Sequence, residues 1–135
     1  MSTTASTNLN LTRVGRICVS VGDTDRALDF YVGTLGFEKI VDVPMGPDAR
    51  WVEVRLRGAE TTIAIAPPPP GTEAGGSDTG IILDTTDVEA DHAALKAAGA
   101  DVDEEISRMG DSVPPMFWVR DADGNSLIIV QPNDA

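Results

Sequence analysis

The sequence predicts an α+β fold made of two βαβββ modules, and three observations lead to it. In each half of the 135 residues, a segment of alternating apolar residues runs into an aspartate that can cap a helix, first Asp23 and then Asp87. An apolar helical stripe follows in each half and stops at a glycine, first Gly36 and then Gly99. Between the halves, four consecutive prolines and a glycine-rich stretch are typical of a linker.

The first half predicts one strand, one helix and three further strands. Residues 14–21, VGRICVSV, alternate with period two, which is typical of a strand with one buried face. The helix that Asp23 caps carries its apolar residues on one face, at Ala27, Leu28, Phe30, Tyr31 and Leu35. Three strand-like segments follow, at 37–43, 50–57 and 61–66.

The second half repeats this plan. Residues 80–85, GIILDT, predict the first strand and residues 88–98 predict the helix. Three strand-like segments follow, at 102–106, 115–120 and 126–130. Asp123-Gly124-Asn125 favours a hairpin turn between the last two, because Gly and Asn tolerate a positive φ. The repeat as a whole predicts a first module over 12–67, a linker over 68–77 and a second module over 78–131.

Composition narrows the class of protein. Lys and Arg number 10 against 22 Asp and Glu, a formal net charge of -12, which would repel a nucleic acid and attract a cationic ligand. No apolar run approaches the roughly 20 residues that span a bilayer, and MSTTASTNLN does not resemble a secretory signal. Cys18 is the single cysteine, which excludes an intrachain disulfide. We therefore expect a cytoplasmic protein with neither a nucleic-acid nor a membrane partner, and a disordered tail over residues 1–11.

Three motifs, DRALDFYVGTLGF, AAGA and DADGNSLIIV, resemble the vicinal oxygen chelate superfamily when they occur in this paired context. That superfamily includes glyoxalase I, bleomycin-resistance proteins and extradiol dioxygenases, and the resemblance covers about residues 14–131. It implies that the two modules form a curved mixed sheet around a cavity. It also implies a homodimer, because a partner chain often completes the cavity in this family.

Metal-using members of that family place His, Gln or Glu on the first and last strands of each module. Carried over to this sequence, the four positions hold Arg16, Ala64, Gly80 and Ile128. A guanidinium group is a permanent cation, and the other three side chains bring no ligand atom. His92, the sole histidine, lies in the second predicted helix at a solvated or rim position and cannot build a metal site alone. We therefore expect no metal and no other cofactor.

Alternation with period two also assigns side chains to the cavity. The expected ligand-binding residues are Arg16, Cys18, Trp51, Glu53, Arg55, Met116, Trp118 and Ile128. Their aromatic and apolar members would form walls, and their charged members would anchor a polar group of the ligand. The tryptophans could equally fill the sheet interface, and the charges could pair as Arg16–Glu53 or Arg55–Asp84 bridges with no further role.

Two functional classes follow from these residues. The first is a binding protein, similar to the drug-resistance members, that takes a small, largely apolar or cationic molecule without the usual metal centre. The alternative is a metal-independent isomerase, lyase or cyclase in which Glu53 or Asp84 is the base and Arg16 or Arg55 holds an oxyanion. A glyoxalase- or dioxygenase-type metalloenzyme is a third class, which the missing ligands disfavour.

Overall fold

The first module has the predicted order of strand, helix and three strands in a computed structural model that describes residues 7–133. Its strands form one mixed sheet in the order β1-β4-β3-β2, in which β1 and β4 are parallel and the other pairs are antiparallel. The elements are β1 (Arg16–Ser20), α1 (Thr24–Leu28), η1 (Asp29–Thr34), β2 (Glu38–Pro44), β3 (Arg50–Arg55) and β4 (Thr62–Ala66).

The second module repeats this topology in a separate sheet of order β5-β8-β7-β6, again with one parallel pair. Its elements are β5 (Asp78–Asp84), α2 (Val88–Ala97), β6 (Asp101–Val102), β7 (Met116–Arg120) and β8 (Ser126–Val130). The predicted fold class, two βαβββ modules, is therefore confirmed. The strands form two four-stranded sheets, not one continuous curved sheet.

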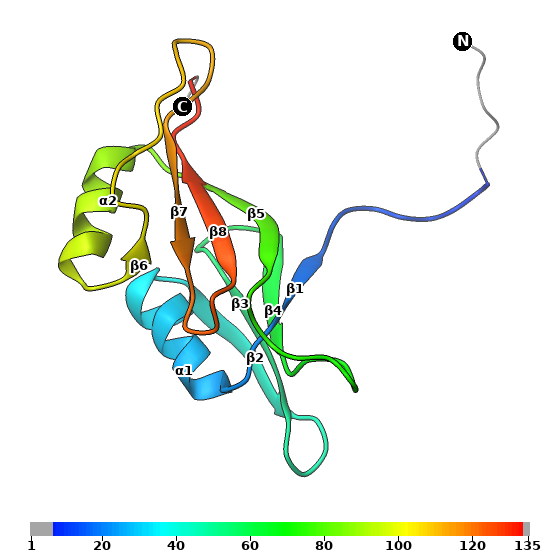
Figure 1. Cartoon of the computed structure of the whole chain (residues 1–135). Coiled ribbons are helices and arrows are strands. Elements are labelled where there is room, and N and C mark those ends of the chain that lie inside the picture. Colours follow the sequence, from blue (N-terminus) through cyan, green and yellow to red (C-terminus); the bar gives the residue numbers. More distant parts are fainter. Residues whose placement is uncertain (1–6, 134–135) are drawn as a thin grey trace.

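Both helices begin where the sequence predicts, because each capping aspartate accepts a backbone hydrogen bond. Asp23 Oδ1 accepts from the Arg26 N–H at 3.1 Å, and Asp87 Oδ1 accepts from the Ala90 N–H at 3.0 Å. Helix α1 continues into η1, which has π-helical hydrogen bonding, so the single predicted helix changes its winding after Leu28. In Figure 1, α1 and α2 lie on the same side of the molecule, against the two sheets.

One continuous core joins the two modules. Its largest fully buried side chains include Tyr31 and Ile65 from the first module and Phe117 and Leu127 from the second. Aligned strand residues alternate between this core and the opposite sheet face, as period two requires. The core therefore holds the modules together on the helix side of both sheets.

Two predicted elements differ from the structure. The strand expected over 102–106 shortens to Asp101–Val102, because the Asp103 carboxylate accepts the Trp118 N–H at 3.0 Å in place of a strand carbonyl. Of the expected tail, residues 1–6 lie outside the described part of the chain, and residues 7–11 form neither helix nor strand. No helix within residues 7–133 is long and apolar enough to cross a membrane.

Candidate functional site

The first sheet places five of the expected ligand-binding residues on the face that points away from the core. Cys18 pairs with Ala64 and Ala64 pairs with Glu53, so all three positions share a face with Arg16 and Arg55. Trp51, two residues before Glu53 on the same strand, shares this face too. The intervening residues Val52 and Val54 are fully buried in the core. We call this surface the first sheet face.

Glu53 is the centre of the polar contacts on the first sheet face. Its carboxylate accepts hydrogen bonds from Trp51 Nε1 and from Thr62 Oγ1, both at 2.8 Å. Arg16 Nε lies 3.4 Å from Glu53 Oε2, so the expected Arg16–Glu53 pair forms. The Trp51 hydrogen bond, followed by those of Thr62 and the charge of Arg16, lowers the pKa of Glu53 against the opposing effect of burial.

These contacts bear on the expected roles of both Trp51 and Glu53. A general base needs a raised pKa near neutrality, whereas Glu53 is held as a carboxylate with both oxygens engaged. Burial acts to raise the pKa of Glu53, but the hydrogen bonds outweigh it, so the net shift is opposite to the one that a general base requires. Trp51 is held by its indole N–H, which fixes the ring on the sheet face.

Arg55 differs from Arg16 in having an unused donor. Its Nε is buried and has no hydrogen-bond partner among residues 7–133. The possible Arg55–Asp84 ion pair is not formed within that range. A buried donor without an acceptor costs about 1–3 kcal/mol. An acceptor atom of a ligand could therefore bind to Arg55 Nε on the first sheet face.

The second sheet presents a more apolar face. Trp118 pairs with Ile128, and Ile128 pairs in turn with Ile82. Met116 lies two residues before Trp118 on the same strand, and the intervening Phe117 is fully buried in the core. The Ile82 side chain is 58% exposed, so this face has a solvent-exposed apolar part. We call this surface the second sheet face.

The chain does not gather these residues into one cavity. The expected site is divided between two sheets, and among the ligand-binding and catalytic candidates only Cys18 and Asp84 line one of five hollows within residues 7–133. Cys18 lines a polar hollow with linker residues such as Glu73, and Asp84 lines an apolar pocket between the modules.

The four positions that would hold a metal in this fold do not fit one. The cross-strand neighbours of Ala64 are Cys18 and Glu53, and those of Ile128 are Ile82 and Trp118, so they add one thiol and one carboxylate. Both oxygens of that carboxylate already accept hydrogen bonds from Trp51 and Thr62. Within residues 7–133, no three His, Cys, Asp or Glu side chains gather in a way that could hold an ion. Arg16 and Gly80, at the two remaining positions, bring a fixed positive charge and no side chain.

His92 is half-buried and makes one hydrogen bond and one ring contact, whereas a solvated or rim position was expected for it. Its Nε2 lies 2.8 Å from the Asp103 carbonyl, and its ring packs edge-on against Phe117 with centroids 4.9 Å apart. The residue therefore packs on the helix side of the second sheet, where it stabilises the junction of α2 and β7.

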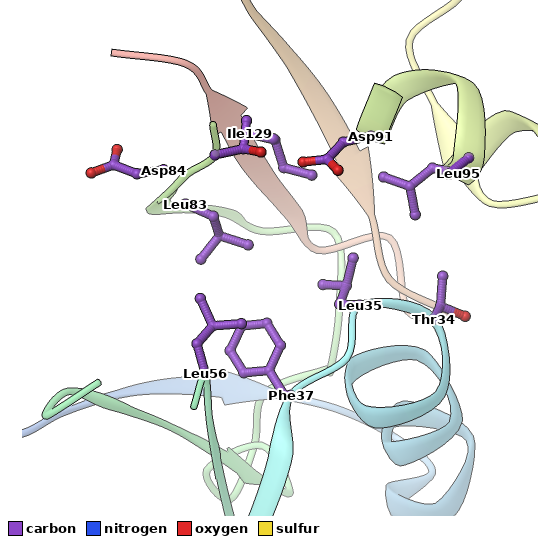
Figure 2. A pocket seen from close by; sticks show the side chains of 11 residues that line it. Thr34, Leu35, Phe37, Leu56, Leu83, Asp84, Asp91, Leu95 and Ile129 are labelled. Carbon is purple, nitrogen blue, oxygen red and sulfur yellow. The ribbon is translucent and has the colours of Figure 1, made fainter. Parts of the chain in front are cut away.

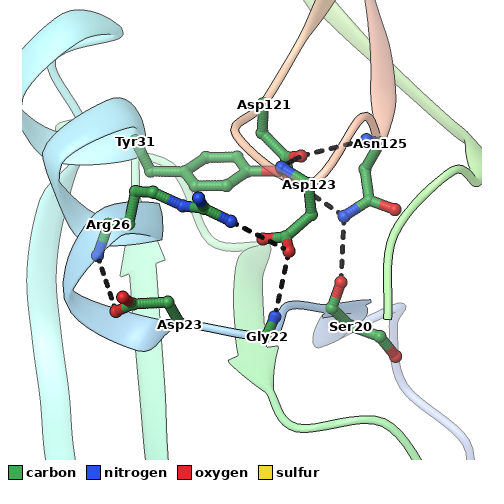
Figure 3. A network of polar contacts seen from close by, with 8 residues as sticks. All are labelled: Ser20, Gly22, Asp23, Arg26, Tyr31, Asp121, Asp123 and Asn125. Carbon is green, nitrogen blue, oxygen red and sulfur yellow. Dashed lines mark hydrogen bonds and ion pairs between the residues drawn. The ribbon is translucent and has the colours of Figure 1, made fainter. Parts of the chain in front are cut away.

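Sequence reasoning missed the role of the turn at Asp121–Asn125, which Figure 3 shows between the modules. Tyr31 donates its hydroxyl to Asp121 Oδ2 at 3.0 Å, and Asn125 Nδ2 donates to the Ser20 carbonyl at 2.9 Å. The Gly22 N–H donates to Asp123 Oδ1 at 3.1 Å. The turn thus fastens the second module to the first, and its only sequence signal was a polar hydroxyl within the apolar stripe of the first helix.

Comparisons with known proteins match almost the whole chain. The model of the Glyoxalase/Bleomycin resistance protein/Dioxygenase superfamily matches residues 13–129. The uncharacterized protein YetH of Bacillus subtilis (strain 168) is 29% identical over 117 residues, which cover 87% of this chain and 96% of YetH.

Two solved structures are similar in both fold and sequence. The first is TnmS3, an antibiotic binding protein from Streptomyces sp. CB03234, with a TM-score of 0.80 and 32% identity over 93% of this chain and all of TnmS3. The second is a superfamily member from Sphaerobacter thermophilus DSM 20745, with a TM-score of 0.81 and 34% identity over 90% of this chain and 98% of the other.

Proposed function

Because the chain belongs to the glyoxalase/bleomycin resistance protein/dioxygenase superfamily, we propose that it is a binding protein for a small, largely apolar or cationic molecule. The ligand would lie against the first and second sheet faces. Trp51, Met116, Trp118 and Ile128 would supply its apolar contacts, and Arg16 or Arg55 would hold a polar group. This function requires no metal.

The observation that carries the proposal is that each sheet presents a tryptophan on the face away from the core. In addition, the metal positions of the fold hold no ligand set within residues 7–133. Trp51 is positioned by Glu53, and Trp118 lies beside Ile128. Aromatic rings held on a rigid strand offer flat apolar surface at little entropic cost. The similarity to TnmS3, an antibiotic binding protein, supports the same function class.

We also propose that the functional unit is a homodimer. In one chain the Arg16 side chain is 57% exposed and Ile82 is 58% exposed, although both lie on the faces expected to contact a ligand. A ligand on such open faces would keep much of its own apolar area in water. A second copy placed over the two sheet faces would enclose the ligand and bury Ile82.

A metal-independent enzyme is a second candidate, favoured by the unpartnered Nε of Arg55. A guanidinium donor without a partner could hold an oxyanion that develops during an isomerase, lyase or cyclase reaction. In this candidate Asp84, which is exposed at the end of β5, would be the base.

The binding function is tested by titrating the protein with emodin, a polyketide-like anthraquinone, with ethidium, an aromatic cation, and with naphthalene. Trp51 and Trp118 are the only tryptophans, so their fluorescence reports on both sheet faces. We expect saturable quenching by at least one probe. Trp118→Ala should weaken that binding by about tenfold, or about 1.4 kcal/mol, whereas Trp118→Phe should keep most of it because a ring remains.

Two results would contradict this proposal. One is binding that is unchanged in both Trp118→Ala and Arg16→Ala, which would place the ligand elsewhere. The other is a stoichiometric transition metal in protein purified without chelator, together with a rise of several degrees in Tm on adding micromolar Zn²⁺, Ni²⁺ or Mn²⁺. Turnover of a bound probe, lost in Asp84→Asn, would favour the enzyme over the binding protein.

A further inference from the structure

The two modules meet at two related junctions, because a helix of each module faces the end of a strand hairpin in the other. At the first junction, Tyr31 of η1 is fully buried and bonds to Asp121 at the β7–β8 turn. At the second junction, Leu95 of α2 and Leu56 after β3 line the same pocket. The two junctions are therefore equivalent places in the repeat.

The spacing of the repeat shows which residues correspond. The helix caps Asp23 and Asp87 lie 64 positions apart, and the same offset relates Tyr31 to Leu95. In the strands, the pair Glu53–Ala64 of the first module corresponds to the pair Trp118–Ile128 of the second. Leu56 lies three residues after Glu53, and Asp121 lies three residues after Trp118. Leu56 therefore corresponds to Asp121. The second junction thus has two leucines where the first has a hydrogen-bonded tyrosine and aspartate.

The two leucines leave a space at the second junction. Leucine is shorter than tyrosine and has no hydroxyl, and the pocket at the second junction has a volume of about 200 Å³. An apolar cavity of roughly 150 Å³ is large enough to take up benzene. We call this space the junction pocket; it has room for an aromatic ring, the group that Tyr31 supplies at the first junction.

The walls of the junction pocket come from both modules. Leu35, Phe37 and Leu56 of the first module face Leu83, Leu95 and Ile129 of the second. Phe37, Leu95 and Ile129 are buried, so these walls belong to the rigid core. Figure 2 shows the apolar side chains converging on one space from the strands and helices around it.

The junction pocket carries negative charge at one side. The half-buried Asp91, in the first turn of α2, points its carboxylate into the space in Figure 2, whereas the Asp84 carboxylate at the rim points away. No Lys or Arg is among the residues that line the pocket. Within residues 7–133, Asp91 forms no ion pair.

We propose that the junction pocket is a second binding site, separate from the two sheet faces, for a small arylalkylamine, a molecule with an aromatic ring and an aliphatic ammonium group. The ring of the ligand occupies the place that corresponds to the Tyr31 ring, and its ammonium group pairs with the Asp91 carboxylate. Burial of the ring supplies the apolar part of the affinity, and the unpaired carboxylate selects a cation over a neutral molecule or an anion.

The test uses tyramine, whose phenol ring matches the tyrosine side chain and whose amine is cationic at neutral pH. The matched probes are p-cresol, which has no charge, and 4-hydroxyphenylacetate, which is an anion. Backbone amide shifts of the ¹⁵N-labelled protein are followed during each titration. We expect saturable shifts with tyramine at Thr34–Phe37 and Asp91–Leu95, weaker shifts with p-cresol, and none with 4-hydroxyphenylacetate.

Two variants test the assigned contacts. Asp91→Asn should weaken tyramine binding by about tenfold, because it removes a charge-assisted hydrogen bond. Asp48→Asn removes the same charge from the exposed β2–β3 loop and should leave tyramine binding within about twofold of the wild type. Leu95→Phe places a ring in the pocket and should abolish the binding of both tyramine and p-cresol.

Several results would overturn the proposal. These are no localised shifts with tyramine, equal binding of tyramine and 4-hydroxyphenylacetate, or an Asp91→Asn variant that binds tyramine as the wild type does. Amide shifts confined to residues of the sheet faces would also overturn the proposal. Since neither tryptophan lines the junction pocket, Trp118→Ala should leave tyramine binding unchanged, which separates a failure here from a failure of the proposed sheet-face site.

Discussion

Glu53 shows how one carboxylate can organise a sheet face. Its side chain is only 12% exposed, yet its charge is matched by two neutral donors and one arginine. A buried charge is tolerated when its lone pairs are filled in this way. The result is a fixed Trp51 ring and an anion that keeps its charge in mildly acidic solution.

We predict that Glu53 makes the folding stability depend on pH. Its pKa is lowered on folding, so it contributes stability that is fully present above about pH 4.5, its ordinary value, and that is lost as the pH falls through the lower folded pKa. Glu53→Gln should therefore be less stable than the wild type at pH 7, and the difference should shrink below pH 4.5. Urea denaturation at a series of pH values measures this.

Glu105→Gln is the control for that series, because Glu105 is exposed on the loop after β6. Its stability should follow that of the wild type at every pH. A Glu53→Gln variant whose deficit stays constant down to pH 2 would show that the carboxylate charge is not the cause.

We predict that Tyr31→Phe weakens the join between the modules. The phenol is buried, and burial followed by the Asp121 charge raises the pKa of Tyr31, so the hydroxyl remains a proton donor. Without it, Asp121 Oδ2 keeps only the Asn125 amide. We expect a loss of about 1–3 kcal/mol in the free energy of unfolding, measured by urea denaturation. A loss below about 0.3 kcal/mol would mean that water replaces the hydroxyl without cost.

At the scale of elements, the end of the expected linker is bound to the β7–β8 turn. The Gly76 N–H donates to the Asp123 carbonyl at 3.0 Å, and the Ser77 N–H donates to Asn125 Oδ1 at 3.2 Å. The same turn bonds to Ser20 and Gly22 just before α1. One turn therefore ties together the linker, the first module and its own hairpin.

We predict that Gly75→Ala is more destabilising than Gly71→Ala. Both glycines have a positive φ, +90° and +82°, which costs an alanine about 1–2 kcal/mol. Only at Gly75 would the added Cβ clash with the Asp123 carbonyl oxygen, whereas nothing lies within 4 Å at Gly71. Overpacking adds about 1–3 kcal/mol, so thermal denaturation should show a clearly lower Tm for Gly75→Ala. Equal Tm values would show that the linker moves freely away from the turn.

At the scale of the whole molecule, the two sides of the sheets differ: one side is packed into the core, and the other carries side chains that are exposed to solvent. The helix side holds a continuous core with residues from both modules. The opposite side presents the two sheet faces, with Arg16 and Ile82 both more than half exposed. This asymmetry is the basis for proposing a partner chain over the open side.

We predict that Ile82→Lys prevents formation of the proposed homodimer. The substitution places a charge on the exposed apolar part of the second sheet face, where association would have to bury it. Sedimentation velocity at micromolar concentration should show a dimer for the wild type and a monomer for the variant. The control is Val32→Lys, since Val32 is 37% exposed on η1 and on the helix side. A wild type that sediments only as a monomer would contradict the prediction.

The sequence by itself determined the repeat, and with it the fold class. Helix caps, glycine stops and period-two strands are local features, each set by a few neighbouring residues, so Asp23, Asp87 and the segment before each could be recognised without tertiary contacts. Alternation also placed Arg16, Cys18, Glu53 and Trp118 on the sheet faces away from the core, because a strand has only two sides.

Only the tertiary structure decided which side chains meet across the modules. The bond between Tyr31 and Asp121 joins residues 90 positions apart, and the junction pocket combines side chains such as Phe37 and Leu95, which no local pattern links. The lowered pKa of Glu53 likewise depends on Thr62 and Arg16 from two other strands. Local sequence sets the conformation of each element, whereas these contacts depend on how the finished elements pack, which is a property of the whole chain.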